Sequence, residues 1–351
     1  MLKGAAIVTG AARHLDLLPN LTAETRVWPI PFADGIEPLL ALRGRSVVIL
    51  ASGDPFWFGA GSVLARHLER TEWQALPAHS VASHAAAHLG WPLEKTPVFG
   101  LHAAPLQRLR PALYAGARLL VLLRDGEAVT KLAAYMTDLG FGASHLWVME
   151  AMGGPRERVR CTTADRLDFD DIHHPVCAAL SVDGSGSPLP VSSGLLDDFF
   201  DHDGQITKRP IRAITLSTLA PLPGEHLWDI GAGSGAIGIE WMLGHPANRT
   251  TAIEHNRERA ARIRHNADAL GAGHLKLFEG NALEFLSSIL AKEPPDAVFI
   301  GGGLCADLLQ VLWQHVPAGT RVVANSVTLE TDTLLSKWHR EAGGTLMRIE
   351  V

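Results

Sequence analysis

The 351-residue sequence predicts an α/β protein built from two domains. Short apolar runs of the kind that form buried strands alternate with segments that suit helices. One such run, residues 226–230, leads into Gly231, Gly233 and Gly235 and then into a helix-forming segment. A glycine turn between a strand and a helix lets the backbone approach a bound nucleotide or nucleoside closely.

The first half of the chain repeats the alternation of strands and helices. The expected strands are residues 5–8, 46–51, 118–123, 145–150 and 176–182, and the expected helices are a segment reaching about residue 70, 85–89 and 128–139. Strands that alternate with helices imply a mostly parallel sheet. Gly, Ser and Pro fill most of residues 183–190, which favours a linker. The predicted parts are therefore a first domain, a linker and a second domain at 1–183, 184–192 and 193–351.

The second half predicts a further set of strands. They are residues 226–229, 250–254, 274–279, 296–300, 321–325 and 344–351, with a helix at 257–270 ended by Gly271. Another helix is expected after Thr207, which can cap it, with Pro210 in its first turn. Capping and a binding role for Thr207 both remain open.

The charge distribution argues against a nucleic-acid substrate. Residues 1–180 hold 17 basic and 17 acidic side chains, whereas residues 181–351 hold 14 and 20, so the net charge of −6 lies in the second half. A nucleic-acid-binding domain normally carries a basic stripe instead. We interpret Arg257, Arg259, Arg262 and Arg264 as the solvated face of a helix.

Cysteine content and hydropathy indicate the cellular compartment of the protein. Cys161, Cys177 and Cys305 are odd in number and widely spaced, so neither a disulfide framework nor a zinc site is indicated. No apolar run approaches the roughly 18–20 residues that span a membrane. A cytoplasmic protein with no metal and no membrane partner is expected.

Two acids near the glycine turn indicate the ligand. Glu254 follows Gly231 by 23 positions, close to the roughly 20 residues at which an acid meets ribose hydroxyls in nucleotide-binding folds. The pattern is Gly-x-Gly-x-Gly, and a site with both Asp229 and Glu254 does not suit a diphosphate. S-adenosylmethionine, which has a ribose and no phosphate, fits better. The alternative is a buried strand end followed by a turn and a surface acid.

Several segments of the second half carry a family resemblance. They are residues 203–209 (Asp-Gly-Gln-Ile-Thr-Lys-Arg), 228–235, 253–254, 279–282 and 296–302. With these segments the second half resembles the class I S-adenosylmethionine methyltransferases, and more narrowly the decarboxylating type of the cobalamin pathway. The resemblance implies a Rossmann-like domain. A seventh, antiparallel strand would normally follow Val351, so we expect a domain without its last strand.

The first half resembles the tetrapyrrole (corrin/porphyrin) methylases through residues 52–55, 80–83 and 100–102. That family opens with a strand and a glycine-proline loop that would precede Met1, so we expect a domain without its first strand, in a chain shortened at both ends. The family also has an element like Ser-Leu-His-Gly-Arg, which is reduced here to residues 100–104 (Gly-Leu-His-Ala-Ala).

The resemblance implies a set of site residues. The cofactor-binding residues would be Thr207, Asp229, Gly231, Ala232, Gly233, Ser234, Gly235, Glu254, Asn281, Ala282 and Gly301 in the second domain and Ser52, Gly53, Asp54 and Ser83 in the first. The substrate-binding residues would be Gln205, Lys208, Arg209 and Gly302. Glu254 would bind the ribose, Asn281 and Ala282 would lie beside the adenine, and the cations would meet substrate carboxylates. A solvated helix start is the alternative for the cations. No catalytic residue is assigned.

The resemblance also implies an activity. The second domain would methylate C15 of a precorrin and remove the C12 acetate carboxyl as carbon dioxide, and the first would methylate C5. A homo-oligomer, dimer or tetramer, is expected, with other enzymes of the pathway as partners. The main alternative is a methyltransferase acting on tRNA or protein, with a non-catalytic scaffold as its first half.

Overall fold

The computed structural model describes residues 2–289 and 293–350. The chain forms two compact units, one made of Met1–Ala103 with Gly116–Gly184 and the other of Ala104–Ala115 with Ser185–Val351. The sequence predicts residues 1–183 as one continuous domain. The segment 104–115, which contains the 3-10 helix Leu106–Ala112, instead groups with the second unit.

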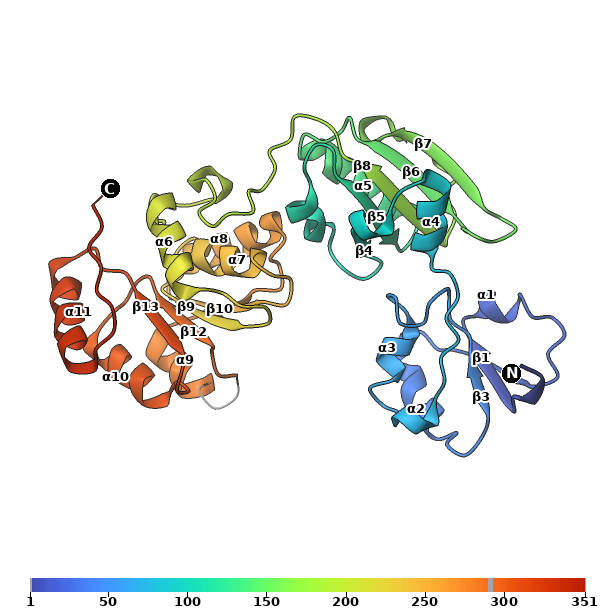
Figure 1. The fold of residues 1–351 in the computed structure, drawn as a ribbon, viewed down its shortest axis with the longest axis horizontal. Helices are drawn as coiled ribbons and strands as arrows, with labels where there is room; N and C mark the ends of the chain where they lie inside the picture. The colour runs from blue at the N-terminus through green and yellow to red at the C-terminus, as the bar shows by residue number, and fades with distance from the viewer. Residues whose placement is uncertain (1, 290–292, 351) are drawn as a thin grey trace. The chain divides into compact units, whose positions relative to one another are not determined.

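The first unit contains a three-stranded parallel sheet in the order β2-β1-β3 (Figure 1). Its strands are β1 (Ile7–Gly10), β2 (Glu24–Val27) and β3 (Val47–Ile49), and its helices are α1 (Ala12–Leu15), α2 (Ile36–Leu40) and α3 (Ala60–Leu64). The central strand β1 is buried along its length because both of its edges are paired and both of its faces are covered.

A five-stranded sheet in the order β4-β5-β8-β6-β7 forms the rest of this unit. Its strands are β4 (Val98–Gly100), β5 (Arg118–Leu123), β6 (His145–Glu150), β7 (Arg158–Thr163) and β8 (Val176–Ser181), with helices α4 (Val81–Leu89) and α5 (Gly126–Asp138). β8 pairs antiparallel with β5 and β6, and β6 pairs antiparallel with β7. The expectation of a mostly parallel sheet is therefore wrong here, because β8 inserts antiparallel between β5 and β6 and β7 returns directly beside β6 without a crossover helix.

The second unit is built on a parallel sheet in the order β11-β10-β9-β12-β13. The strands are β9 (His226–Ile230), β10 (Arg249–Glu254), β11 (Lys276–Glu279), β12 (Ala297–Ile300) and β13 (Arg321–Ala324). The order reverses beside β9, where the chain passes first to β10 and later to β12. Ligands bind at such a switch point, at the carboxyl ends of the strands.

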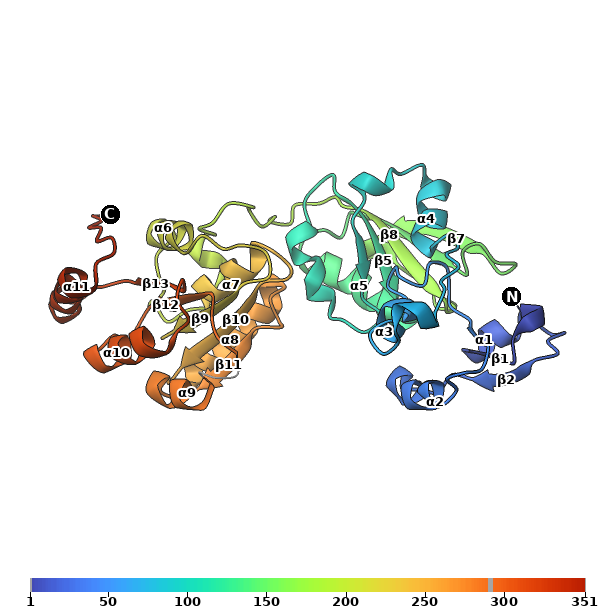
Figure 2. The same ribbon diagram turned by 60° about the horizontal axis from the view of Figure 1, so that its bottom comes forward.

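Helices cover both faces of this sheet (Figures 1 and 2). They are α6 (Arg209–Leu219), α7 (Ala236–Leu243), α8 (Arg257–Leu270), α9 (Ala282–Ile289) and α10 (Ala306–His315). Helix α11 (Leu329–Ala342) lies beyond β13 at the edge of the sheet, where its Trp338 packs against Trp313 of α10. Leu227 of β9 packs in the core formed with α6, α7 and α8, whereas the next residue, Trp228, packs with α9 and α10. This alternation, expected for a strand buried on both faces, confirms a doubly wound α/β fold.

Two expectations about this unit are wrong. Lys208, not Thr207, is the N-cap residue of α6, and no side chain caps this helix, whose Pro210 lies in the first turn as expected. Residues 344–350 form no strand. Their apolar residues, Leu346, Met347 and Ile349, favour a strand, but a strand also needs a neighbour with which its backbone groups pair. β13 remains at the edge of the sheet.

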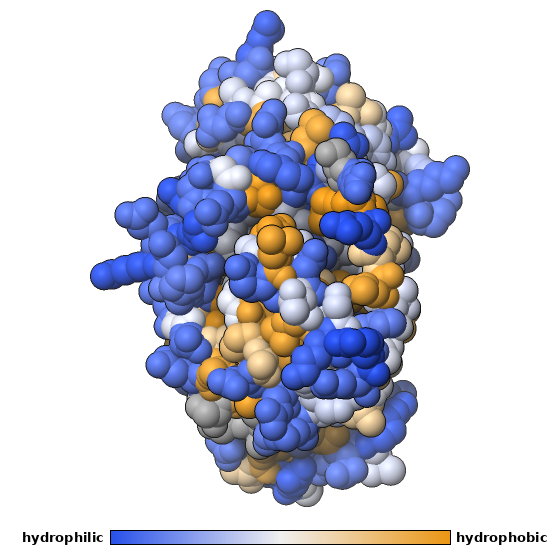
Figure 3. Space-filling view, turned by 90° about the vertical axis from the view of Figure 1, so that its left-hand side faces the viewer, coloured by the Kyte–Doolittle hydropathy of each residue, from blue (hydrophilic) through white to orange (hydrophobic). Residues whose placement is uncertain are grey.

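The face of the second unit that carries α10, α11 and residues 343–350 exposes several apolar side chains. Figure 3 shows apolar patches between hydrophilic side chains on this face. Trp313, Leu329 and Met347 are among the exposed residues of these segments. Within the described part of the chain, no helix combines the length and the apolar character that crossing a membrane requires.

Candidate functional site

The second unit contains a cavity of about 1220 Å³ at the carboxyl ends of its strands. Twelve residues proposed from the sequence line it: Gln205, Thr207, Lys208, Gly231, Ala232, Gly233, Ser234, Glu254, Asn281, Ala282, Gly301 and Gly302. Asp229, Arg209 and Gly235 do not. The space is several times larger than a small metabolite needs, so it can accept two ligands side by side.

Four residues lie in a row along this edge of the sheet. In the strand register Ile253 and Ile300 both lie opposite Ile230, and Ala324 lies opposite Ile300. The next residues, Glu254, Gly231, Gly301 and Asn325, are therefore neighbours across the ends of β10, β9, β12 and β13. Since adjacent strands lie about 4.8 Å apart, Asn325 is one strand from Gly301 and three strands, about 14 Å, from Glu254.

The glycine turn needs its glycines for two separate reasons. Gly231 has a φ of +67°, and a Cβ on it would lie 2.6 Å from the backbone N and O of Gly302. Gly233 has a φ of +61°, and its notional Cβ would meet only the backbone of Gln205, at 3.6 Å. Gly231 thus allows β9 and β12 to end in contact, whereas Gly233 keeps open the space between the turn and residue 205.

Glu254 holds the turn and faces the cavity. Its carboxylate accepts hydrogen bonds from the backbone N–H groups of Gly233 and Asn256, both at 2.9 Å, although its exposed fraction is only 2%. A carboxylate has about four lone-pair positions, so acceptor capacity remains for two vicinal hydroxyl groups. This is the donor-acceptor match that a ribose requires, and the residues therefore fit S-adenosylmethionine.

Helix α8 joins two walls of the cavity. Asn266 donates to the carbonyls of Asp201 and Ser234, both at 2.9 Å, and accepts from the Asp201 N–H at 2.8 Å. Arg259 donates to Asp203 and to the Gln205 side chain, each at 2.8 Å. Arg259 also holds the pKa of Asp203 down at about 2. The interpretation of the α8 arginines as a solvated face is thus wrong for Arg259 and for Arg262, which pairs with Asp203 at 3.2 Å.

A buried ion pair fixes the segment that precedes α6. Arg212 is fully buried and donates to Glu240 at 2.6 Å and to Asp197 at 2.9 Å, and its guanidinium also reaches the carbonyls of Leu195 and Thr207. Glu240 in turn accepts from the Gly194 and Leu195 N–H groups. These contacts position Thr207 and Lys208 against the cavity.

The two predicted substrate cations differ in their surroundings. Lys208 lines the cavity, and the structure records no ion pair for it with any described residue. Arg209 points elsewhere, because its Nε donates to the Gly194 carbonyl at 2.9 Å. Arg348, which the sequence did not single out, also lines the cavity. Nothing in its local sequence signals this position, since residues 344–350 read as a strand.

Asp229 lies beneath the turn instead of in the cavity. One oxygen accepts from the Gly238 N–H at 3.0 Å, and the other has no hydrogen-bond partner among the described residues. Burial, and to a lesser degree the charge of Glu254, raises the pKa of this carboxyl to about 7, against the opposing effect of the Gly238 N–H.

This raised pKa makes stability depend on pH. Asp229 keeps its proton up to about pH 7 in the folded protein but loses it near pH 4 in the unfolded chain. The protonated Asp229 therefore contributes its full stabilisation below pH 4, and this contribution is lost as the pH rises through 7. Relative to Asp229→Asn, the wild-type free energy of unfolding should therefore fall by about 4 kcal/mol between pH 4 and 8. Urea unfolding at several pH values measures this, and parallel curves for the two proteins would contradict it.

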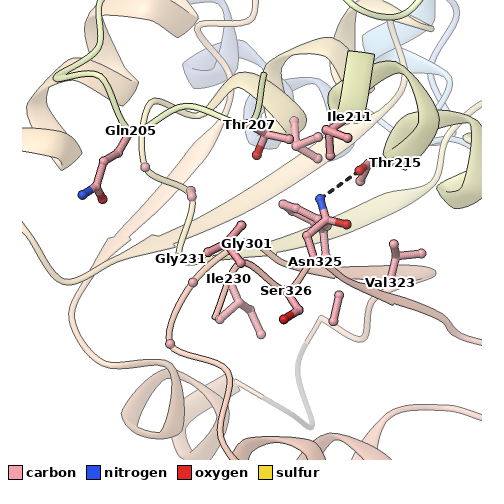
Figure 4. A pocket seen from close by; sticks show the side chains of 18 of the residues that line it. Gln205, Thr207, Ile211, Thr215, Ile230, Gly231, Gly301, Val323, Asn325 and Ser326 are labelled. Atoms are coloured by element: carbon pink, nitrogen blue, oxygen red, sulfur yellow. Dashed lines mark hydrogen bonds between the residues drawn. The ribbon is translucent and has the colours of Figure 1, made fainter. Parts of the chain in front are cut away.

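A polar pair that the sequence did not predict faces the cavity beyond the turn. The Asn325 amide donates to the Thr215 hydroxyl at 3.0 Å, and both residues line the cavity (Figure 4). The one available signal was the place of Asn325 at the end of a parallel strand. Its partner comes from α6, 110 positions earlier, and this pairing has no local signature.

The remaining cofactor candidates of the second unit occupy a loop. Asn281 accepts from the Leu283 N–H at 2.8 Å and so holds the start of α9, with Ala282 beside it. Gly235 has a φ of +78° and packs against Ile263 of α8. Among the residues that the structure describes, no cluster of His, Cys, Asp or Glu is arranged to hold a metal ion.

The four candidates of the first unit come together around two turns. Ser52 bonds to Arg13 at 3.1 Å and to His14 at 2.9 Å, and burial lowers the pKa of His14. A Cβ on Gly53 would lie 2.9 Å from the Cα of Ser80, the residue that caps α4. Asp54 accepts from the Phe56 N–H at 2.8 Å, and the Ser83 N–H donates to the Ser80 hydroxyl. The residue runs 52–54 and 80–83 are therefore neighbours.

Comparison with known families accounts for nearly the whole chain. Residues 198–351 match the model of a precorrin methyltransferase domain, and residues 1–168 match that of the tetrapyrrole (corrin/porphyrin) methylases. A decarboxylating precorrin-6Y C(5,15)-methyltransferase of Sinorhizobium sp is 44% identical over 355 residues, which cover 100% of this chain and 85% of the relative. The enzyme of the same description from Mycobacterium tuberculosis is 35% identical over 357 residues, covering 99% of this chain and 87% of the relative.

Solved structures give matches to each half. The C-terminal domain of a precorrin-6Y C5,15-methyltransferase from Rhodobacter capsulatus is 43% identical, covers 46% of this chain and 86% of that one, and has a TM-score of 0.44. A precorrin-6Y methylase from Archaeoglobus fulgidus is 24% identical, with coverages of 52% and 86% and a TM-score of 0.38. Both scores are below 0.5, so the assignment depends on the sequence relatives. The chain belongs to the family of the decarboxylating precorrin-6Y C(5,15)-methyltransferases.

Proposed function

We propose that the second unit methylates C15 of a precorrin and removes its C12 acetate carboxyl as carbon dioxide, in cobalamin biosynthesis. The observation that carries this proposal is the row of Glu254, Gly231 and Gly301 along one cavity. In this proposal Glu254 accepts hydrogen bonds from the ribose, and the glycine turn at Gly231 lets the cofactor approach the backbone closely. Gly301 has no side chain, so the substrate carbon can reach the methyl group there.

The residues of the site divide into two groups by position. Glu254, Ala232, Gly233, Ser234, Asn281 and Ala282 lie on the side where the cofactor would bind. S-adenosylmethionine supplies an electrophilic methyl group, so the main task of the chain is to align the acceptor carbon with it. Gly301 and Gly302 leave room for that alignment, because neither carries a side chain.

Lys208 and Arg348 are the cations proposed to bind carboxylates of the tetrapyrrole. A precorrin carries several acetate and propionate groups, and both cations line the cavity. Arg209 is engaged with Gly194, so Lys208 is the stronger candidate of the predicted pair. Gln205 also lines the cavity, and Arg259 donates to its amide oxygen.

Lys208→Ala should weaken tetrapyrrole binding about tenfold and leave affinity for S-adenosylmethionine unchanged, because one charge-assisted contact is lost. Fluorescence titration with the tetrapyrrole and calorimetry with the cofactor measure the two affinities. Lys337→Ala is the matched control, since Lys337 is exposed on α11 and does not line the cavity. Equal tetrapyrrole affinity in the two variants would contradict the role of Lys208.

The first unit is proposed to methylate C5 through a site that includes Ser52, Gly53, Asp54 and Ser83. The proximity of residues 52–54 to 80–83 supports a shared site. Mass spectrometry of the products tests the whole proposal. One added methyl with loss of carbon dioxide indicates that the second unit alone works, and two added methyls with the same loss indicate both. Transfer to bulk tRNA or protein instead would favour the main alternative.

We also place the protein in the cytoplasm as a homo-oligomer. Its three cysteines are all free, which suits a reducing compartment. The apolar patches of the face in Figure 3 support self-association. Sedimentation velocity of the purified chain tests the oligomeric state.

A further inference from the structure

The pair formed by Asn325 and Thr215 has hydrogen-bond donors that bond to none of the described residues. The Asn325 amide gives one N–H to the Thr215 oxygen at 3.0 Å, which leaves its second N–H free to donate. The Thr215 oxygen accepts in this bond, so its own O–H proton is available as well. Thr215 is 97% buried and Asn325 is half-buried, and both line the cavity.

Two aliphatic side chains border the pair. Val323 is two residues before Asn325 on the strand, and Ile211 is one turn before Thr215 on α6, so each lies on the same face as its polar neighbour. Figure 4 shows both side chains beside the pair, and both line the cavity. A ligand group that reaches this point therefore meets two neutral donors in an apolar wall.

The position of the pair fits one arm of the proposed substrate. Asn325 is the neighbour of Gly301 in the register, and its N–H donates to the Ile300 carbonyl at 3.2 Å. Gly301 marks where the acceptor carbon would meet the methyl group, and Glu254 lies on the opposite side of the turn. In the substrate, the C12 acetate belongs to the pyrrole ring beside C15. Asn325 is about one strand spacing from Gly301, so an acceptor carbon over Gly301 leaves that arm within reach of the pair.

We propose that Asn325 and Thr215 bind the C12 acetate carboxylate and orient it for loss as carbon dioxide. This inference rests on the proposed function of the second unit. In the step, the bond between the methylene carbon and the carboxylate carbon breaks and carbon dioxide leaves. The electron pair passes into the conjugated macrocycle, and the methylene carbon then takes a proton from water to become a methyl group.

The neutral character of the pair decides which carboxylate is lost. A cation beside a carboxylate stabilises its ionised ground state and so opposes decarboxylation. Arms held by Lys208 or Arg348 are therefore retained. Two neutral donors in an aliphatic wall orient a carboxylate while stabilising its charge less than an ion pair would. The cavity thereby determines which of several similar carboxylate arms is lost as carbon dioxide and which are kept.

Two variants that preserve side-chain volume test the assignment. Asn325→Leu removes the amide donors, and Thr215→Val removes the hydroxyl with almost no change of shape. In each, carbon dioxide released per methyl transferred to C15 should fall about tenfold, while affinity for S-adenosylmethionine stays within twofold of wild type. Labelled carbon dioxide capture and product mass spectrometry give the ratio, and calorimetry gives the affinity and reports folding of the site.

Ser217→Ala is the matched control, because Ser217 lies on the same helix, is exposed and does not line the cavity. It should keep the wild-type ratio. An unchanged ratio in Asn325→Leu and Thr215→Val would overturn the inference while leaving the proposed function intact. Should Asn325→Leu fail to bind the cofactor, the Thr215→Val result alone decides. A wild-type protein that transfers methyl without releasing carbon dioxide would contradict both proposals.

Discussion

Glu254→Ala should abolish measurable binding of S-adenosylmethionine. The Glu254 carboxylate is the acceptor that we propose for the two ribose hydroxyls, and hydrogen bonds to a charged group contribute about 1.5–3 kcal/mol each. The loss of two such bonds lowers affinity at least about 100-fold. The change also releases the N–H groups of Gly233 and Asn256, which Glu254 now holds at 2.9 Å, so the turn loses its support as well.

Calorimetric titration with S-adenosylmethionine measures this loss. Glu254→Gln should also bind S-adenosylmethionine weakly. The glutamine NH₂ group would face the backbone N–H of Gly233 or of Asn256, and two donors cannot form a hydrogen bond. Glu258→Gln is the matched control, since Glu258 is an exposed acid in the first turn of α8 and does not line the cavity. Affinity within threefold of wild type in Glu254→Ala would exclude the ribose assignment.

Arg212→Met should destabilise the second unit by about 3–5 kcal/mol, because it leaves the Glu240 carboxylate buried without its cation. The carbonyls of Leu195 and Thr207 lose a donor at the same time. Urea unfolding, followed by the fluorescence of buried tryptophans such as Trp228 and Trp241, measures the change.

The double variant Arg212→Met/Glu240→Leu should recover part of the loss, since replacing both members of a buried pair is often neutral or stabilising. The recovery should be incomplete, because Glu240 also serves the N–H groups of Gly194 and Leu195. Arg257→Ala, at an exposed site on α8, should leave stability within about 0.5 kcal/mol. A wild-type midpoint for Arg212→Met would contradict the importance of the pair.

Local patterns made the strands and the glycine turn beside the cavity predictable. The strand, the glycine turn, Glu254 and the capping Gly271 of α8 are all encoded by short-range signals, and the structure has these elements at the expected residues. Once the strands are parallel, their carboxyl ends share one edge. That rule brings Glu254, Gly231 and Gly301 together without any knowledge of side-chain contacts.

Long-range pairing made other features unpredictable. Residues 344–350 are rich in apolar side chains but pair with no strand among the described residues. The sequence does not predict β7, because only Val159 and Cys161 of its six residues are apolar. Whether β8 runs parallel or antiparallel depends on the strands with which it pairs, and no local sequence pattern predicts that pairing. Likewise Arg259 looks like a surface cation until the loop around Asp203 folds against it.

The bridge that α8 makes between two cavity walls bears on the thermodynamics of cofactor binding. Asn266 and Arg259 fix residues 201–205 and the glycine turn through hydrogen bonds between protein atoms. Ordering of these segments is therefore completed during folding, and binding need not lose their conformational entropy. Protection of the amides of this loop from hydrogen exchange should change little when the cofactor is added. The binding site is thus preorganised for the cofactor. The entropy lost in ordering residues 201–205 and the glycine turn instead lowers the folding stability of the second unit.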